Sequence, residues 1–170
     1  MRQTLAEFNS LRREEAEMEL MKCCGSSAWA REVVAARPFS SMYEVLAAAD
    51  RIWWSLGAAD WLEAFSHHPQ IGGKSAERAQ SGEASRWSQE EQSGTRDADA
   101  ETREALAWAN RAYLQKFGYI FIVCATGKSA AEMLALCEQR LQNDRETELR
   151  IAAEEQRRIT HLRLRKLLEL

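Results

Sequence analysis

The fold class is clearest in one segment, Ser41-Met42-Tyr43-Glu44-Val45-Leu46-Ala47-Ala48-Ala49-Asp50-Arg51-Ile52-Trp53-Trp54-Ser55-Leu56. Its first four residues have the capping-box form, in which a serine and a glutamate three residues later satisfy the free N–H groups at a helix start. The large apolar residues then recur at helical spacing along one side. The segment is therefore predicted to be a helix with one buried face.

The same signals recur along most of the chain. Capping boxes also stand at Thr4–Glu7 and Ser129–Glu132. Only Pro38 and Pro69 interrupt helix formation. Further helices are predicted around Trp29, Val33 and Val34 (ended by Pro38), from Asp97 to Phe117 with Ala105, Trp108, Ala109, Ala112 and Tyr113 on one side, from Ala130 to Gln142, and from about Arg145 onward. Gly118 is suited to a left-handed cap. The pattern predicts an all-α protein, a helical bundle forming one domain over residues 1–170.

Tyr119–Cys124 is the only strand-like run. It has no partner run with which to form a sheet. We therefore expect a buried extended segment and no sheet. Its backbone N–H and C=O groups need partners, which a bound polar ligand, neighbouring side chains or water can supply.

The stretch from Gly72 to Gly94 is rich in Gly, Ser, Gln and charged residues. It is predicted to be a long loop, with a short helix starting at Ser88. Trp87 is its only large apolar residue, and packing is the simplest role for that side chain. Loops of this length in compact domains are usually functional or disordered.

Just before this loop comes Ser66-His67-His68-Pro69-Gln70-Ile71-Gly72-Gly73. A proline disfavours the α conformation in the residue before it. The apolar helical run that ends at Phe65 should therefore stop here and hold His68 at the start of a loop. Imidazole moves protons near neutral pH, although a structural or surface histidine has the same local signature.

Composition excludes several classes of protein. The chain has 170 residues, 45% of them hydrophobic and 29% charged, which is typical of a globular domain. A net charge of −3 argues against nucleic-acid binding. No apolar run reaches the roughly 20 residues that span a bilayer, and the first residues lack a secretory signal. We expect a cytoplasmic protein.

The four cysteines, Cys23, Cys24, Cys124 and Cys137, form no Cys-x-x-Cys pair. They suit neither a disulfide framework nor a zinc ribbon, and we expect buried, reduced thiols. The last helix interleaves apolar residues with arginines such as Arg157, Arg158 and Arg165. Such a charge run usually faces solvent, and docking of a partner is the alternative.

Short motifs along nearly the whole chain resemble one family. They are Phe8-Asn9, Cys23-Cys24-Gly25-Ser26 with Trp29, Arg37-Pro38-Phe39, His68-Pro69-x-Ile71-Gly72, Ser88-x-x-Glu91-Gln92, Asn110-x-x-Tyr113, Phe117-Gly118-Tyr119-x-Phe121, Arg140-Leu141-x-Asn143, Glu148-Leu149 and Ile159-x-x-x-Arg163-Leu164. Together and in this order they resemble the family of 2-oxo-4-hydroxy-4-carboxy-5-ureidoimidazoline (OHCU) decarboxylases. The departures are His67 before the His-Pro pair, Tyr119 in place of the commoner phenylalanine, and Ile120 where proline is frequent.

The resemblance implies an all-helical fold and an enzyme, a carboxy-lyase that converts OHCU to S-allantoin and CO2 in urate breakdown. It implies that neither a metal ion nor an organic cofactor is needed. The partner is then the small-molecule substrate, with no nucleic acid or membrane involved. A homodimer is permitted but not required.

The resemblance also implies the site residues. His68 would bind the substrate hydroxyl, either orienting the carboxylate or accepting the hydroxyl proton, and Glu91 would orient the substrate or return a proton. Gln92 would bind the ureido or ring amide, and Arg163 the carboxylate or ureido group, with Arg165 as a competitor for that role. The other residues expected at the substrate are Pro69, Ser88, Phe117 as pocket wall, Gly118 as turn, and the main chain near Ile120 and Ile122.

Other interpretations of the same residues remain. Ser88–Glu91 has the capping-box form, so the carboxylate can serve a helix start instead. A non-enzymatic helical module would use Arg157, Arg158 and Arg165 for docking. A metal-dependent lyase built on His67 and His68 lacks a third ligand.

Overall fold

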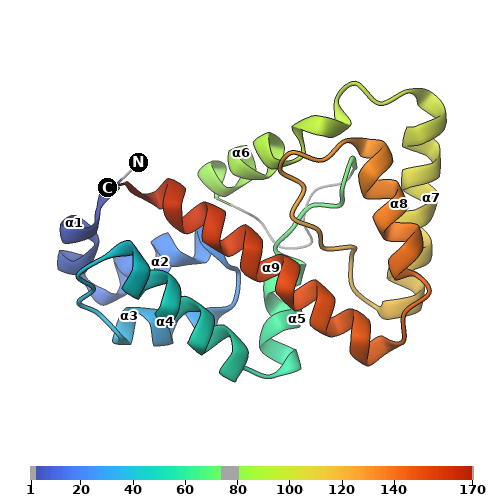
Figure 1. Ribbon diagram of the computed structural model, residues 1–170. Helices are drawn as coiled ribbons and strands as arrows, with labels where there is room; N and C mark the ends of the chain where they lie inside the picture. The colour runs from blue at the N-terminus through green and yellow to red at the C-terminus, as the bar shows by residue number, and fades with distance from the viewer. Residues whose placement is uncertain (1–2, 74–80, 170) are drawn as a thin grey trace. The chain divides into compact units, whose positions relative to one another are not determined.

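The computed structural model describes residues 3–73 and 81–169, most of which are helical (Figure 1). The helices are α1 (Leu5–Ser10), α2 (Arg13–Cys23), α3 (Ser27–Ala35), α4 (Met42–Ser55), α5 (Ala58–Ser66), α6 (Gly82–Glu91), α7 (Ala100–Phe117), α8 (Ala130–Arg140) and α9 (Arg145–Leu167), with a 3-10 turn, η1 (Ser93–Thr95), after α6. The prediction of an all-α protein is confirmed.

Two very short strands lie at the ends of the described chain. β1 (Gln3–Thr4) and β2 (Leu168–Glu169) pair in parallel, with Gln3 opposite Leu168 and Thr4 opposite Glu169. Apart from this one pair, the expectation of a fold without a sheet holds for the described residues. Two residues are too short to leave an alternating pattern in the sequence.

The fold divides into two compact units. The first comprises Met1–Ala64 with Arg157–Leu170, and the second comprises Phe65–Gln156. Helices α5 and α9 each contribute residues to both units. The expectation of a single domain remains a prediction.

In the first unit, α4 buries the side that the sequence predicts. Val45, Ala49, Ile52 and Trp53 are buried, and the Trp29 indole of α3 donates to the Ala49 carbonyl at 3.1 Å. The helix begins at the expected serine, because the Ser41 hydroxyl accepts from the N–H of Glu44. Apolar periodicity and a cap thus define this helix together.

The second unit is organised around α7 and α8. Its core includes the aromatic rings of Tyr113, Phe117 and Phe121, which pack with Met133 of α8. Gly118 ends α7 in the left-handed conformation, at φ 83°, as predicted.

The predicted inner face of α7 is wrong at one position. The Trp108 side chain is 58% exposed, whereas Leu106, Ala109 and Asn110 are buried. The helix also starts later than predicted, because the carboxylate of Asp99 rather than that of Asp97 caps it through the N–H of Thr102.

The predicted long loop contains a full helix. α6 begins at Gly82, where the Ser81 hydroxyl accepts from the N–H of Ala84 at 3.2 Å. Ser88 lies inside this helix, so the prediction of a helix start and capping box at Ser88 is wrong. The polar composition of this stretch suggested a loop, because the helix buries only one narrow side, which includes Trp87. Residues 74–80 of the predicted loop lie outside the described part of the chain.

Residues 120–125, which cover most of the predicted extended segment, form neither a helix nor a strand, and Phe121, Ile122 and Val123 are buried. Side chains satisfy three of its backbone groups. Arg140 donates to the Ile122 carbonyl at 2.7 Å, the Cys124 N–H donates to Glu155 at 2.8 Å, and Lys128 donates to the Cys124 carbonyl at 2.7 Å. Of the alternatives that the sequence leaves open, neighbouring side chains are the partners for these groups.

Gly94 allows the turn after α6 to approach the start of α8. A Cβ atom at this position would collide with the backbone carbonyl oxygen of Lys128. We expect Gly94→Ala to lower the free energy of unfolding by about 1–3 kcal/mol, the usual range for overpacking, as measured by urea denaturation.

Gly82→Ala is the matched control for this substitution. Nothing lies within 4 Å of a Cβ at Gly82, so stability should be unchanged or slightly higher because alanine restricts the unfolded chain. Equal stability of the two variants would contradict the close approach at Gly94.

Candidate functional site

His68 stands where the sequence predicts, directly after the end of α5. The His68 N–H donates to the Phe65 carbonyl at 3.2 Å, and the proline follows. The half-buried imidazole places its Nε2 atom 2.7 Å from Oε1 of Gln156, a fully buried side chain of α9. This contact fixes the position of the ring.

The carboxyl-terminal end of α6 is joined to the loop that follows His68. Oε1 of Gln92 accepts from the Gly72 N–H at 3.0 Å. Gly72 is four residues beyond His68, a span of at most about 14 Å along an extended chain. Glu91, the last residue of α6, is only 8% exposed. The structure thus brings Gln92, and with it the end of α6 that carries Glu91, to the His-Pro loop.

One turn of α9 holds two parts of this region. Glu155 accepts from the backbone of Cys124 in the extended segment, and Gln156, the next residue, contacts His68. Burial raises the pKa of the Cys124 thiol, Lys128 opposes the shift, and the negative charges of Glu155 and Glu91 add to it. Glu91 thus contributes to the electrostatic surroundings of the Cys124 thiol.

Glu155 and Gln156 were not predicted as part of the site. In the sequence they appear as two more polar residues of a charged helix. The partner of Gln156 is 88 residues away along the chain, so no local spacing links them. Only a pattern shared among relatives would have drawn attention to them.

Beneath the extended segment lies a buried ion pair. Nε of Arg140 donates to Oε1 of Glu148 at 2.7 Å, and the same oxygen accepts from the Tyr113 hydroxyl at 2.5 Å. Asn143 donates to the second oxygen at 3.0 Å. Burial, together with the Glu148 hydrogen bond, raises the pKa of the Tyr113 hydroxyl, so it serves as a donor. These motif residues hold the fold, and Arg140 holds the Ile122 carbonyl as well.

The other predicted residues of the second unit have varied surroundings. Ser88 is buried in α6, and Pro69 and Ile120 are half-buried. The Phe117 ring packs 4.6 Å from that of Tyr113, centroid to centroid, within the core. Gly118 is the turn that was predicted, while the buried Ile122 already has its carbonyl bound by Arg140. Their contact with a substrate remains a prediction.

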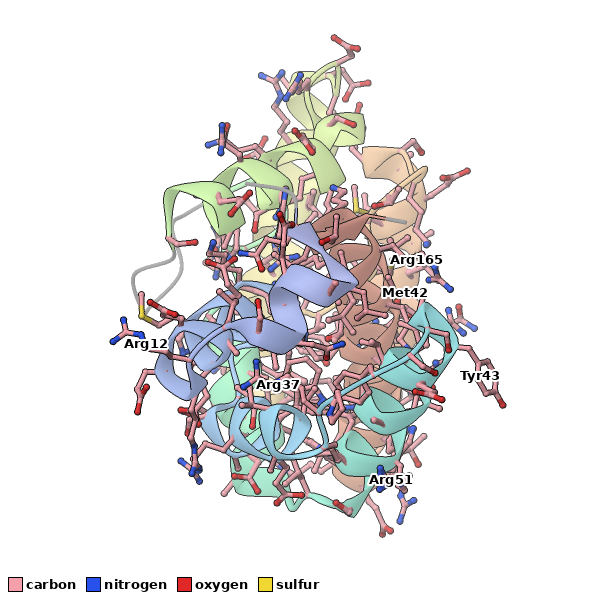
Figure 2. The ribbon with its side chains drawn as sticks, turned by 90° about the vertical axis from the view of Figure 1, so that its left-hand side faces the viewer. Arg12, Arg37, Met42, Tyr43, Arg51 and Arg165 are labelled. Atoms are coloured by element: carbon pink, nitrogen blue, oxygen red, sulfur yellow. The ribbon has the colours of Figure 1, made fainter. Side chains whose placement is uncertain are left out.

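Arg163 belongs to the first unit. It is only 3% exposed, and its Nη1 atom donates to the Lys22 carbonyl, near the end of α2, at 3.1 Å. Burial raises the pKa values of the neighbouring thiols Cys23 and Cys24, the latter to about 12, so both are protonated. Arg165, the competing arginine, is exposed and points outward in Figure 2.

The prediction of a solvated arginine face on the last helix is wrong at two positions. Arg163 is buried, and Arg157 donates to Asp50 of α4 at 3.2 Å. The same carboxylate lies 2.6 Å from Nε2 of His161. These residues stabilise the first unit, which leaves Arg158 and Arg165 as exposed members of the docking face considered above.

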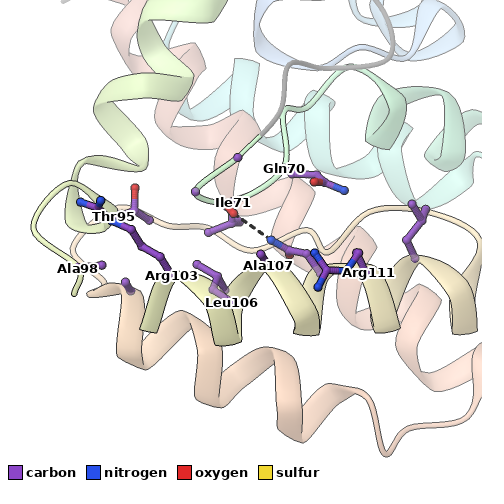
Figure 3. Close-up of a pocket in the computed structure, with 13 residues that line it drawn as sticks. Gln70, Ile71, Thr95, Ala98, Arg103, Leu106, Ala107 and Arg111 are labelled. Carbon is purple, nitrogen blue, oxygen red and sulfur yellow. Dashed lines mark hydrogen bonds between the residues drawn. The ribbon is translucent and has the colours of Figure 1, made fainter. Parts of the chain in front are cut away.

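A pocket of about 290 Å³ opens beside α7 (Figure 3). The loop residues Gln70–Gly73 form one wall, and Leu106 and Asn110 of α7 form another. The Asn110 amide donates to the Ile71 carbonyl at 2.9 Å, which fixes the loop against the helix. Neither His68 nor Glu91 lines this pocket.

Within residues 3–73 and 81–169, no three His, Cys, Asp or Glu side chains gather as a metal site would require. No helix in the described part of the chain combines the length and apolar character needed to cross a bilayer.

Comparison with known proteins identifies the family. A family model described as OHCU decarboxylase matches residues 9–165. The uric acid degradation bifunctional protein TTL of Arabidopsis thaliana is 41% identical over 155 residues, which are 91% of this chain and 48% of that protein. The 2-oxo-4-hydroxy-4-carboxy-5-ureidoimidazoline decarboxylase of Amia calva is 29% identical over 140 residues, or 82% of this chain and 79% of that protein.

The fold agrees with these sequence matches. A crystal structure of OHCU decarboxylase in the presence of (S)-allantoin aligns with a TM-score of 0.78 and 39% identity, covering 90% of this chain and 99% of that one. The chain spans about half the length of the Arabidopsis relative. Because the family model matches residues 9–165, nearly the whole of this chain, the chain belongs to the OHCU decarboxylase family.

Proposed function

We propose that this chain is a carboxy-lyase that converts OHCU to S-allantoin and CO2 in urate degradation. Family membership supports the activity, and the similar crystal structure was determined in the presence of (S)-allantoin. The observation that carries the site assignment is the joining of three elements: the His-Pro loop, the end of α6 and the extended segment. Gln92, Glu155 and Gln156 make those joins.

The substrate itself supplies most of the electronic chemistry. Loss of CO2 leaves an electron pair on the ring carbon that carried the carboxylate. The adjacent ring C=N accepts that density, which gives an enol-like intermediate with the hydroxyl on the new C=C bond, so no external electron sink is required. The protein has to hold the ring, move protons, and deliver one proton to a single face.

His68 is the proposed partner of the substrate hydroxyl, and Glu91 the group that orients the substrate or returns the proton. Burial of Glu91 favours this role, since a carboxylate in a low-dielectric setting interacts strongly with a nearby ligand. Gln92 already uses its amide oxygen at Gly72, and its NH2 group supplies donors for the ureido or ring carbonyl.

Arg163 is the proposed ligand of the substrate carboxylate. Its guanidinium is buried and anchored at one atom by the Lys22 carbonyl, whereas that of Arg165 is exposed. A planar fork of donors fits a planar carboxylate. Anchoring favours Arg163 because it lowers the entropy lost on binding.

Several further features belong to the proposal. The reaction needs neither metal nor organic cofactor, because the substrate stabilises its own carbanion. A cytoplasmic location agrees with four cysteines that form no disulfide. A homodimer is compatible with the activity, and no nucleic acid or membrane takes part.

The activity is tested with OHCU made from urate by upstream enzymes, with the purified chain added last. Addition should speed the loss of OHCU and give a single enantiomer of allantoin, which is detected by circular dichroism of the product. When CO2 is lost without the enzyme, the intermediate is protonated on both faces and both enantiomers form. A racemic product at the uncatalysed rate would refute the function.

Glu91→Gln tests the role of the carboxylate. The substitution keeps the shape of the side chain but removes its charge and basicity, so the rate of stereospecific turnover should fall by roughly 10²-fold or more. Glu90→Gln is the matched control, because Glu90 is the neighbouring but exposed glutamate of α6. Equal rates for the two variants would remove Glu91 from the site.

A further inference from the structure

Two histidines of this chain have side-chain partners of different charge. Nε2 of His161 lies 2.6 Å from a carboxylate oxygen of Asp50 in the first unit. Nε2 of His68 lies 2.7 Å from the amide oxygen of Gln156 in the second unit. The contacts are nearly equal in length and use the same ring nitrogen. The first brings a carboxylate to the ring, together with Nη1 of Arg157 at 3.4 Å, whereas the second brings a neutral amide.

The difference determines what each partner does to the imidazole. A carboxylate favours the positively charged imidazolium. An amide oxygen accepts a hydrogen bond without a full charge, so it orients the ring and adds no such bias. Gln156 is fully buried, which prevents water from replacing it as the acceptor.

The hydrogen bond also selects one tautomer. Because the amide oxygen only accepts, Nε2 of His68 must carry the hydrogen. In the neutral ring, the accepting lone pair is then on Nδ1. A base that takes a proton from a hydroxyl group needs such a lone pair, held in a fixed direction.

We propose that Gln156 is a positioning residue that fixes the His68 ring with a hydrogen on Nε2, so that the neutral ring presents its lone pair on Nδ1. The inference rests on the proposed decarboxylase function, in which His68 accepts or shares the substrate hydroxyl proton. Gln156 acts through His68, and the neighbouring Glu155 accepts a hydrogen bond from the extended segment. This turn of α9 thus positions two parts of the proposed site.

The decisive substitution is Gln156→Glu, which puts a carboxylate in place of the amide that contacts His68. An opposite charge this close raises a histidine pKa by about 1–3 units. His68 should therefore titrate at higher pH in NMR spectra, and the acid limb of kcat/KM should move upward by a similar amount. At pH 7 the rate should fall about tenfold or more, as the ring becomes protonated.

A second substitution, Gln156→Leu, tests tautomer selection without adding charge. At high pH, the ring ¹⁵N chemical shifts of wild-type His68 should show the hydrogen on Nε2. The shifts of the variant should show a mixture of the two tautomers. KM should change little, while kcat falls. Gln156→Asn, which keeps the amide, should recover part of the loss.

Two controls isolate the effect. Gln139→Glu adds the same charge at an exposed position of α8 and should leave both the profile and the His68 titration unchanged. Asp50→Asn removes the carboxylate beside His161 and should leave the His68 titration and the pH profile of kcat/KM unchanged. The other titratable groups on the joined elements, among them His67, Glu91, Cys124, Lys128 and Glu155, are unchanged in every variant.

The outcomes separate this inference from the proposed function. Wild-type protein without turnover would refute the function, and the NMR titration would still decide the role of Gln156. Active wild type with an unshifted His68 titration in Gln156→Glu, or with hydrogen on Nδ1, would overturn the inference. Should Gln156→Glu lose its helical circular dichroism, the tautomer ratio in Gln156→Leu decides instead.

Discussion

Replacing His68 with asparagine is expected to slow stereospecific turnover of OHCU by roughly 10²- to 10⁴-fold, the usual contribution of general acid–base catalysis. Asparagine is of similar size and can still hydrogen bond to Gln156, but it does not exchange protons near neutral pH. The loss should appear in kcat, because removing proton transfer leaves the ligands of the substrate in place. Stopped-flow or continuous absorbance assays of OHCU give the rate.

His67→Asn is the closest control, because it makes the same change one residue earlier. This variant should keep most of the activity, and both variants should keep the helical circular dichroism of the wild type. If His67→Asn lost the activity and His68→Asn retained it, the catalytic imidazole would be His67. If both variants kept the full rate, neither histidine would act in the reaction.

The largest effect on stability is expected for Glu148→Ala. This substitution leaves the buried guanidinium of Arg140 without its charge partner, and deprives the Tyr113 hydroxyl and the Asn143 amide of their acceptor. Breaking a buried ion pair from one side typically costs about 3–5 kcal/mol. Urea denaturation followed at 222 nm measures the loss.

Glu146→Ala is the matched control on the same helix. Glu146 is 85% exposed and lies 4.0 Å from Arg150, so its removal should change stability very little. The double variant Arg140→Met with Glu148→Leu should be more stable than Glu148→Ala, because no isolated charge remains. Equal stability of Glu148→Ala and Glu146→Ala would show that the buried pair contributes no more than an exposed one.

Local sequence signals predicted the helices where a cap and an apolar face coincide. Thr4, Ser41, Ser129 and Gly118 all lie at the predicted helix ends. The start of α6 was missed because Ser81 has no glutamate three residues later. Polar residues then cover most of that helix, so composition favoured a loop.

The predicted site residues could be recognised only through the family motifs. His68, Glu91 and Gln92 lie on elements that the structure joins. The burial of Arg163 could not be predicted, because an arginine bound to a distant carbonyl and an arginine in water look alike in the sequence. Burial is decided by which elements pack together, and the Lys22 carbonyl is 141 residues away.

The manner in which the extended segment is held has a consequence for solubility. A strand that leaves its N–H and C=O groups open is a template onto which other molecules add edge to edge, a common route to aggregates. Here Arg140, Glu155 and Lys128 occupy those groups at Ile122 and Cys124. These three backbone groups are therefore unavailable for pairing with a strand of another molecule.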